Sequence, residues 1–275
     1  MHRKSLSYPY ILWMILFIIF PLFLIIFYGF TESGSNGAEF SLESFKRIFE
    51  PVYLRVIARS LLLALYSTVI CLLIGYPAAL FLADKNLSNR NIFLILIVLP
   101  MWMNFLLRTY AWLSLLENNG LINQFFEMVG IPKMQLMYNE EAVILGMVYN
   151  FLPFMILPIY SVICKIDSSV VEAARDLGGN GMTVFRRIIL PLSMPGVLSG
   201  ITMVFMPAAS TFVISRLLGG GKVNLIGNII EQQFMVTGDW GFGSALSLFL
   251  MLLIMLSMLV INKGGDKGYE GGGLY

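Results

Sequence analysis

The chain has 275 residues, of which 58% are hydrophobic and 12% are charged, and its mean hydropathy is +0.81. A soluble domain carries about 25% charged residues, so much of this surface must face lipid. The 18 basic and 16 acidic residues give a formal net charge of +2, which excludes the strongly basic surface of a nucleic-acid-binding protein. The two cysteines, Cys71 and Cys164, lie in or beside apolar segments and predict neither a disulfide framework nor a metal site.

Six stretches are long and apolar enough to cross a bilayer as helices, which takes about 20 residues each. They contain no Asp or Glu and cover residues 11–30, 60–83, 92–116, 143–164, 197–217 and 242–261. Their continuous apolar runs exclude a β-barrel, in which apolar and polar residues alternate. A cleaved signal peptide is the alternative for the first stretch, but its apolar run exceeds the usual length of about 7 to 15 residues, so we expect a retained helix. The sequence therefore predicts an all-α integral membrane protein with six transmembrane helices.

The charges of the connecting segments predict the orientation. Ten basic and six acidic residues lie in one set of segments, 1–10, 84–91, 165–196 and 262–275. Six basic and ten acidic residues lie in the alternating set, 31–59, 117–142 and 218–241. Because short basic segments stay in the cytoplasm, we expect both termini to be cytoplasmic.

The polar segment 165–196 predicts a short helix, a glycine turn and a second helix. Ser169 and Glu172 have the spacing of a capping box, so a helix should begin there. Its apolar face is expected to consist of Val170, Val171, Ala174 and Leu177. Glycines at 178, 179 and 181 should end it, and a second helix should follow over 182–190 and end at Pro191. From this pattern alone, an interfacial helix lying on lipid headgroups is an equal alternative.

The same segment carries a motif of seven fixed residues. Glu172, Ala173 and Ala174 are followed after three residues by Gly178, and after nine more by Ile188, Leu190 and Pro191. This order reproduces EAA-x3-G-x9-I-x-LP and resembles the EAA motif of ABC importer permeases. The resemblance implies a type I ABC importer permease of the MetI-like fold, multi-pass in the bacterial inner membrane. The small alanines allow another protein to approach, and Gly178 permits the chain reversal.

The resemblance also implies the domain organisation and the partners. Residues 1–59 would form a tail, an extra first helix and an outer loop, residues 60–258 the permease domain, and residues 259–275 a flexible end. The expected partners are the lipid bilayer, a second homologous permease subunit, a dimer of a cytoplasmic ATP-binding subunit and an extracytoplasmic solute-binding protein. The residues expected to couple to the ATPase are Glu172, Ala173, Ala174, Arg175, Asp176, Gly178 and Pro191.

Further stretches, of which 102–110, 150–154, 225–234 and 239–243 are the clearest, are similar to the PotB-type permeases of spermidine/putrescine importers. Nearly the whole chain shares the likeness, which implies polyamine transport. Permeases for ferric iron, thiamine and phosphonate-type solutes share parts of the pattern and remain alternatives. Arg216 stands where an acidic residue is expected in some polyamine-type members, which puts the guidance of cations at that position in doubt.

Polar side chains inside a membrane usually face a cavity or a partner, because they are costly in lipid. Asn104, Arg108 and Tyr110 are expected to share one face of the third span. For Arg108, a structural link to a neighbouring carbonyl or subunit carboxylate is the favoured alternative to a role in the path, and snorkelling to the outer face is a third. The full set of path candidates is Trp102, Asn104, Arg108, Tyr110, Asn150, Ser210 and Arg216. The acidic residues lie in the connecting segments, Glu231 and Asp239 among them, where they would draw cations or contact a binding protein.

The sequence does not indicate an enzyme. It has no P-loop, since Gly221 and Lys222 are preceded by Arg216 at the position of the first glycine and followed by Val223. His2 is the single histidine, so we expect no metal, no cofactor and no histidine-based catalysis. ATP hydrolysis should belong to a partner. A proton-coupled secondary transporter is disfavoured because the spans have no carboxylates, and a membrane scaffold without transport activity is the remaining alternative.

Overall fold

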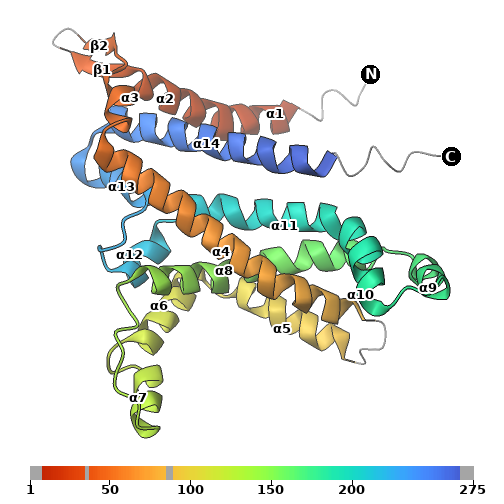
Figure 1. The fold of residues 1–275 in the computed structure, drawn as a ribbon. Coiled ribbons are helices and arrows are strands. Elements are labelled where there is room, and N and C mark those ends of the chain that lie inside the picture. Colours follow the sequence, from red (N-terminus) through yellow and green to blue (C-terminus); the bar gives the residue numbers. More distant parts are fainter. Residues whose placement is uncertain (1–7, 35–36, 85–88, 267–275) are drawn as a thin grey trace.

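The computed structural model describes residues 8–34, 37–84 and 89–266, which are almost entirely helical (Figure 1). The predicted all-α class is confirmed, with one short antiparallel hairpin in which Thr31 pairs with Phe40. The elements are α1 (Tyr8–Met14), the π-helical turn η2 (Ile15–Ile19), α2 (Phe20–Gly29), β1 (Thr31–Gly34), β2 (Gly37–Phe40), α3 (Glu43–Ile48), α4 (Pro51–Ala83), α5 (Arg90–Trp102), α6 (Phe105–Leu116), α7 (Leu121–Met128), α8 (Glu140–Ile163), α9 (Ser168–Asp176), α10 (Gly181–Val184), the π-helical turn η3 (Phe185–Ile189), α11 (Leu190–Ser210), α12 (Val213–Gly219), α13 (Ile226–Gln232), the π-helical turn η4 (Gln233–Thr237) and α14 (Trp240–Asp266).

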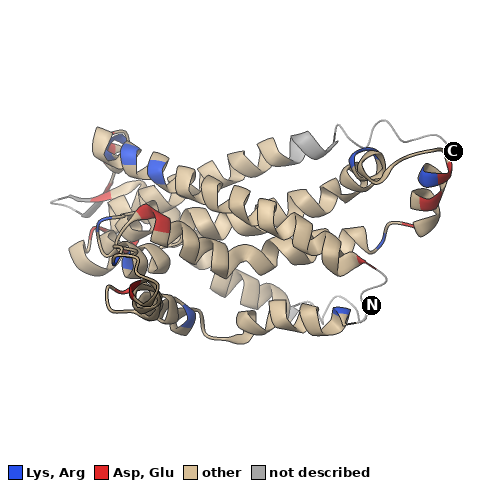
Figure 2. Cartoon of the chain, turned by 60° about the horizontal axis from the view of Figure 1, so that its bottom comes forward, with Lys and Arg blue, Asp and Glu red and all other residues tan. Residues whose placement is uncertain are grey.

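Five helices in the described ranges are long and apolar enough to cross a membrane, and the number is six if the bent pair Arg90–Trp102 and Phe105–Met128 is taken as one broken span. The five are Pro9–Gly29, Pro51–Ala83, Glu140–Ile163, Gly181–Ser210 and Trp240–Ile261. Charged side chains gather at the two ends of these helices and leave the middle uncharged (Figure 2). We call these ends the α9 end, where α1 begins and α14 ends, and the hairpin end, where β1 and β2 lie (Figure 1).

The third predicted span, 92–116, is not one helix. The segments Arg90–Trp102 and Phe105–Met128 are bent by 97° at Met103 and Asn104. Asn104 is the N-cap of α6, and its Oδ1 accepts from the backbone N–H of Leu106 at 2.8 Å. The Asn104 side chain thus satisfies a backbone donor in the first turn of α6. Pro100, in the last turn of α5, has no backbone N–H, so this turn lacks one of the hydrogen bonds of a regular helix.

Two other predicted spans have different boundaries. The second begins at Pro51 rather than at residue 60, because proline is well suited to the first turn of a helix. The fifth covers Gly181–Ser210 rather than 197–217, since the chain is extended at Thr211 before α12 begins. Ser60, the predicted start of the second span, is a buried helix residue whose hydroxyl accepts from the Ile226 N–H at 2.8 Å.

The core of the bundle is the contact among α4, α8 and α11. Met155 of α8 is fully buried and touches both neighbours at glycines. A Cβ on Gly75 would lie 3.0 Å from its Cγ, and one on Gly200 would lie 2.7 Å from its Sδ. A Cβ on Gly196 would lie 2.9 Å from the Pro158 carbonyl oxygen. Glycine is therefore required at Gly196 and Gly200 for the helix backbones to approach each other closely.

A second layer consists of α2 lying alongside α14 (Figure 1). At the hairpin end, Phe242 is fully buried and its ring packs on Tyr53 of α4, with ring centroids 4.8 Å apart. The Arg47 guanidinium lies 4.1 Å from the same ring centroid and pairs with Asp239 at 2.9 Å. Asp239 also accepts from the Phe242 N–H, so one carboxylate both caps α14 and holds α3 against it.

We expect Gly200→Val to destabilise the folded protein by about 1–3 kcal/mol, because the added side chain would force α8 and α11 apart. Thermal unfolding of the purified protein in detergent, followed by circular dichroism, should show a lower Tm. Gly181→Ala is the control, since no atom lies within 4 Å of a Cβ added there. An unchanged Tm for Gly200→Val would contradict the described packing.

Candidate functional site

The first candidate is the segment around α9, and its N-terminus differs from the prediction. Asp167, not Ser169, is the N-cap, and its Oδ1 accepts from the Ser169 N–H at 3.0 Å. Aspartate and serine are similarly good caps, so the sequence pattern did not distinguish the two starts. The helix begins one residue after Asp167, which leaves Glu172 in its middle on the exposed surface.

The glycine turn after α9 has the predicted role. Gly178 has φ +84°, in the left-handed region that favours glycine. The Gly178 N–H bonds to the Arg175 carbonyl at 2.9 Å and the Gly179 N–H bonds to the Ala174 carbonyl at 3.0 Å. These two bonds form a Schellman motif, which satisfies the last carbonyls of the helix. The turn therefore fixes where α9 points relative to the helix that follows.

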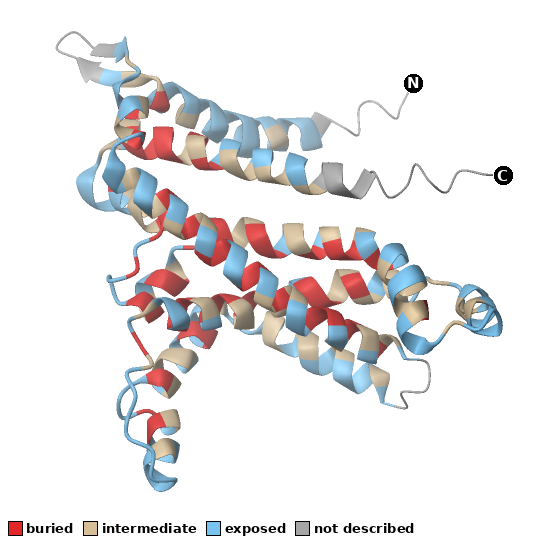
Figure 3. Ribbon diagram, viewed as in Figure 1, coloured by how far each residue is buried: buried red, intermediate tan, exposed pale blue. Residues whose placement is uncertain are grey.

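The surface of α9 is more exposed than the predicted apolar face requires. None of its residues is buried, and Figure 3 shows it projecting from the bundle. Val171 and Ala174 are half-buried, whereas Val170 is 42% and Leu177 is 90% exposed. The four side chains were expected on one face of the helix, and that face is not packed against the bundle, since Val170 and Leu177 are exposed. An exposed leucine beside Ala173 and Ala174 leaves an apolar surface open to a partner.

The predicted second helix does not end at Pro191. Helices α10, η3 and α11 form one helix over Gly181–Ser210, and Pro191 lies in the first turn of α11. The Leu190 N–H bonds five residues back to the Phe185 carbonyl, so the helix widens to a π turn just before the proline. This widening changes the hydrogen-bond register and allows the helix to continue despite the donor that proline lacks.

The root of this helix is fastened to the core. The Tyr76 hydroxyl of α4 and the Ser193 hydroxyl of α11 are 2.7 Å apart and hydrogen-bonded. The Tyr76 ring also meets the Phe185 ring of η3 edge to face, with centroids 5.9 Å apart. A displacement of η3 thus reaches both α4 and α11.

The path candidates in the third and fourth spans do not form the single face that was predicted. Asn104 is a helix cap, Trp102 is 84% exposed and Tyr110 is 51% exposed. Arg108, in contrast, is only 8% exposed. Arg108 and Tyr110 differ in exposure because residues two apart lie on nearly opposite sides of a helix. Asn150 is 1% exposed and donates to the Gly146 carbonyl of its own helix at 2.8 Å. Thus only Arg108 and Asn150 of this group face the interior.

Both interior side chains have unsatisfied atoms. Among the described residues, no partner lies within hydrogen-bonding distance of Arg108 Nε and Nη1 or of Asn150 Oδ1. Buried polar atoms normally have a partner, and an unsatisfied atom costs about 1–3 kcal/mol. Their position in the bundle fits a polar path through the membrane or a polar contact with another subunit.

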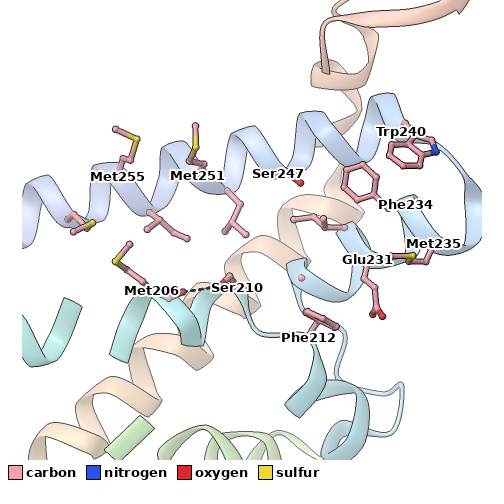
Figure 4. A pocket seen from close by; sticks show the side chains of 15 residues that line it. Met206, Ser210, Phe212, Glu231, Phe234, Met235, Trp240, Ser247, Met251 and Met255 are labelled. Atoms are coloured by element: carbon pink, nitrogen blue, oxygen red, sulfur yellow. Dashed lines mark hydrogen bonds between the residues drawn. The ribbon is translucent and has the colours of Figure 1, made fainter. Parts of the chain in front are cut away.

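The remaining two candidates, Ser210 and Arg216, lie at the hairpin end. The Ser210 hydroxyl donates to the Met206 carbonyl and lines a groove of about 710 Å³ between α11, α13, η4 and α14 (Figure 4). Arg216 pairs with Glu231 of α13 at 2.7 Å. Glu231 was predicted only as an acidic loop residue, yet it lines the same groove. The sequence signal that could have singled it out is a lone carboxylate directly after Ile229 and Ile230. Arg216 is neutralised by this partner, so its positive charge does not stand alone in a cation path.

Residues 72–263 match the family described as "Binding-protein-dependent transport system inner membrane component". The chain belongs to this family. It is 42% identical over 256 residues to the spermidine/putrescine transport system permease protein PotB of Haemophilus influenzae, covering 91% of this chain and 90% of the relative. The PotB of Escherichia coli is 40% identical over 253 residues, covering 90% and 92%.

Solved structures show the same fold. A chain of a bacterial ABC transporter involved in the import of the acidic polysaccharide alginate has a TM-score of 0.83 at 16% identity, covering 96% of this chain and 94% of that chain. A chain of the MetNI methionine transporter has a TM-score of 0.53 at 16% identity, covering 78% and 93%. The predicted MetI-like permease fold is therefore confirmed, and this permease is an inner-membrane component of an ABC transport system.

We expect Asp167→Ala to loosen the first turn of α9, because it removes a cap that stabilises a helix by about 1 kcal/mol. Hydrogen exchange of the backbone amides over 168–171 should become faster. Asp167→Asn is the matched control and should exchange at the original rate, since asparagine also caps helices. Equal protection in Asp167→Ala would mean that Asp167 does not set the start of α9.

Proposed function

We propose that this chain is the permease subunit of an ATP-driven importer for polyamines such as spermidine and putrescine. It forms half of the translocation path, together with a second homologous permease. Two copies of a cytoplasmic ATPase subunit supply ATP hydrolysis, and an extracytoplasmic solute-binding protein delivers the substrate. The permease itself carries out no covalent chemistry.

The observation that supports the substrate is the likeness to two proteins named PotB. The identity of 40–42% extends over nine-tenths of both chains, so it includes the loops and spans around the path as well as the coupling segment. The chain has aromatic side chains in its spans, Trp102, Tyr110 and Tyr149 among them, and aromatic faces attract ammonium groups. The alternative substrate is another small solute, such as ferric iron, thiamine or a phosphonate. The uptake experiment below distinguishes this alternative from a polyamine.

The coupling role is supported by the exposed α9 and by the single helix that follows it. We infer that α9 docks in the ATPase through Glu172, Ala173, Ala174, Arg175 and Asp176. Gly178 sets the angle of the chain, and the helix of 30 residues that contains Pro191 continues for about 45 Å toward the hairpin end. Closure of the ATPase dimer then displaces α9, and the helix transmits that displacement across the membrane. The path would open toward the outside in response.

In this orientation the α9 end is cytoplasmic. The interior side chains Arg108 and Asn150 are the polar groups that we assign to the path or to its contact with the second permease. Ser210 lines the groove at the opposite end. Trp102, Asn104 and Tyr110, at or near the bend between α5 and α6, remain candidates for the substrate path. Arg216 is a further candidate, and its charge is paired with that of Glu231.

We expect Glu172→Lys and Gly178→Asp to abolish ATP-dependent spermidine uptake and to leave the protein inserted in the membrane. The measurement is uptake into proteoliposomes that hold the permease with its second permease and ATPase, with the binding protein outside. Glu39→Lys has the same charge change at the exposed hairpin and should retain uptake. Normal uptake in Glu172→Lys would contradict the coupling role. Uptake of iron or thiamine with none of spermidine would keep the importer and reject the substrate.

The two natural cysteines test the orientation. Cys164 is exposed at the α9 end, whereas Cys71 is buried. A membrane-impermeant maleimide should therefore label the protein in inside-out vesicles and not in right-side-out vesicles. Cys164→Ser should abolish the label and Cys71→Ser should not. Labelling restricted to right-side-out vesicles would reverse the orientation.

A further inference from the structure

Glu231 of α13 carries a carboxylate whose two oxygens have different surroundings. Its Oε1 accepts from Nη1 of Arg216, on α12, at 2.7 Å. Its Oε2 is buried, and among the described residues it has no hydrogen-bond partner. The Glu231 side chain is 19% exposed, whereas that of Arg216 is 59% exposed. A buried anionic oxygen without a donor is costly, so the carboxylate has room for one further hydrogen-bond donor.

The surroundings of Glu231 indicate which kind of donor would bind there. Among the described residues that line the groove, Glu231 alone is charged, and most of the others are apolar. Figure 4 shows the Glu231 carboxylate directed toward Phe212 and away from Trp240. A charged donor binds a carboxylate more strongly than a neutral one, and the face of an aromatic ring attracts a cation. The carboxylate therefore suits a cation that also has an apolar part, such as an alkylammonium.

The position of Glu231 does not depend on its pairing with Arg216. Asn228, one turn before Glu231, donates to the Phe212 carbonyl at 2.9 Å. Asn228 also accepts from the hydroxyl of the fully buried Ser215 at 2.6 Å. These two bonds join α13 to α12 beside the carboxylate. An ion pair with an exposed partner contributes little to stability, so the Arg216 side chain can leave the carboxylate while the two helices stay joined.

We propose that Glu231 binds an ammonium group of the polyamine, and that Arg216 is a tethered cation that occupies the carboxylate until the substrate displaces it. The proposal rests on the proposed function, which supplies a substrate with several ammonium groups. An ammonium donates up to three hydrogen bonds, so it can bind Oε2 while the guanidinium is still on Oε1. The repulsion between the two cations then moves the exposed Arg216 side chain away.

The location of Glu231 agrees with an entry site. The carboxylate lies toward the hairpin end, which faces the outside in the proposed orientation. The segments expected on that side hold six basic and ten acidic residues, so their excess negative charge draws cations toward the site. A tethered cation keeps the carboxylate neutralised when no substrate is present, and only a competing cation with suitable donors replaces it.

The experiment measures the binding of labelled spermidine to the assembled importer in nanodiscs of phosphatidylcholine, in the presence of a non-hydrolysable ATP analogue. The binding protein is left out, so that its own site does not contribute. Glu231→Gln keeps the shape of the side chain and should weaken binding about tenfold, because a neutral amide replaces the charged acceptor. Arg216→Gln should strengthen binding about two- to fivefold, because the competing cation is removed.

The opposite directions of these two effects distinguish competition from a structural role. If the ion pair only stabilised the fold, both variants would change binding in the same direction, since each removes the same pair. That result, or an unchanged affinity in Glu231→Gln, would overturn the proposal. Glu140→Gln is the matched control, because it breaks the ion pair of Glu140 with Arg59 at 2.6 Å. It should leave the affinity for spermidine unchanged.

A lipid headgroup is the other source of an ammonium. Phosphatidylcholine has a quaternary ammonium without an N–H to donate, whereas phosphatidylethanolamine has a primary ammonium. Adding phosphatidylethanolamine to the nanodiscs should leave spermidine binding unchanged. Weaker binding that is seen in the unaltered chain and not in Glu231→Gln would assign the carboxylate to lipid and overturn the proposal.

Failure of this proposal and failure of the proposed function give different results. Spermidine binding that Glu231→Gln does not weaken would overturn the role of Glu231 alone. An unaltered importer that binds no polyamine, and takes up none when the binding protein is added, would overturn both.

Discussion

The structure depends on one contact, the packing of Met155 against Gly75 and Gly200. The Met155 side chain of α8 fills the space that the two glycines leave on α4 and α11, so the three helices pack closely, and in lipid such packing replaces the hydrophobic driving force that holds soluble proteins together. Closely packed interiors transmit displacement instead of absorbing it. A helix that is fixed to this core can therefore carry a movement from one side of the membrane to the other.

The long helix of α10, η3 and α11 uses that property. It begins at the glycine turn after α9, is bonded to α4 through Ser193 and Tyr76, and ends at Ser210 beside the groove. Irregular backbone is tolerated at membrane depth only where other groups satisfy it. In this chain the π turn before Pro191 and the cap by Asn104 provide those groups, and they lie close to α9 and at the start of α6. The irregular backbone at the π turn and at the Asn104 cap thus lies next to segments to which we assign a role in movement or in contact.

Much of this organisation could be predicted from the sequence. The lengths of the apolar stretches predicted six spans. Gly178 was correctly expected to reverse the chain, because glycine readily adopts the left-handed conformation that such a turn requires. The sequence did not predict the bend at Asn104, since an asparagine within an apolar run looks like a polar group on a helix face. It also placed a helix end at Pro191, because the hydrogen-bond shift that accommodates a proline is not visible in residue types. Pairs such as Arg216 and Glu231 depend on the contact between α12 and α13, which no local pattern specifies.

The central claim is that α9 docks on the ATPase and drives the helix that follows. Cross-linking in the assembled importer tests it most directly, with a cysteine introduced at the exposed Leu177 and a short bifunctional thiol reagent. The account predicts a product with the mass of this chain plus one ATPase subunit, and none from a cysteine introduced at Phe40 of the hairpin. A product from Phe40 and none from Leu177 would contradict it.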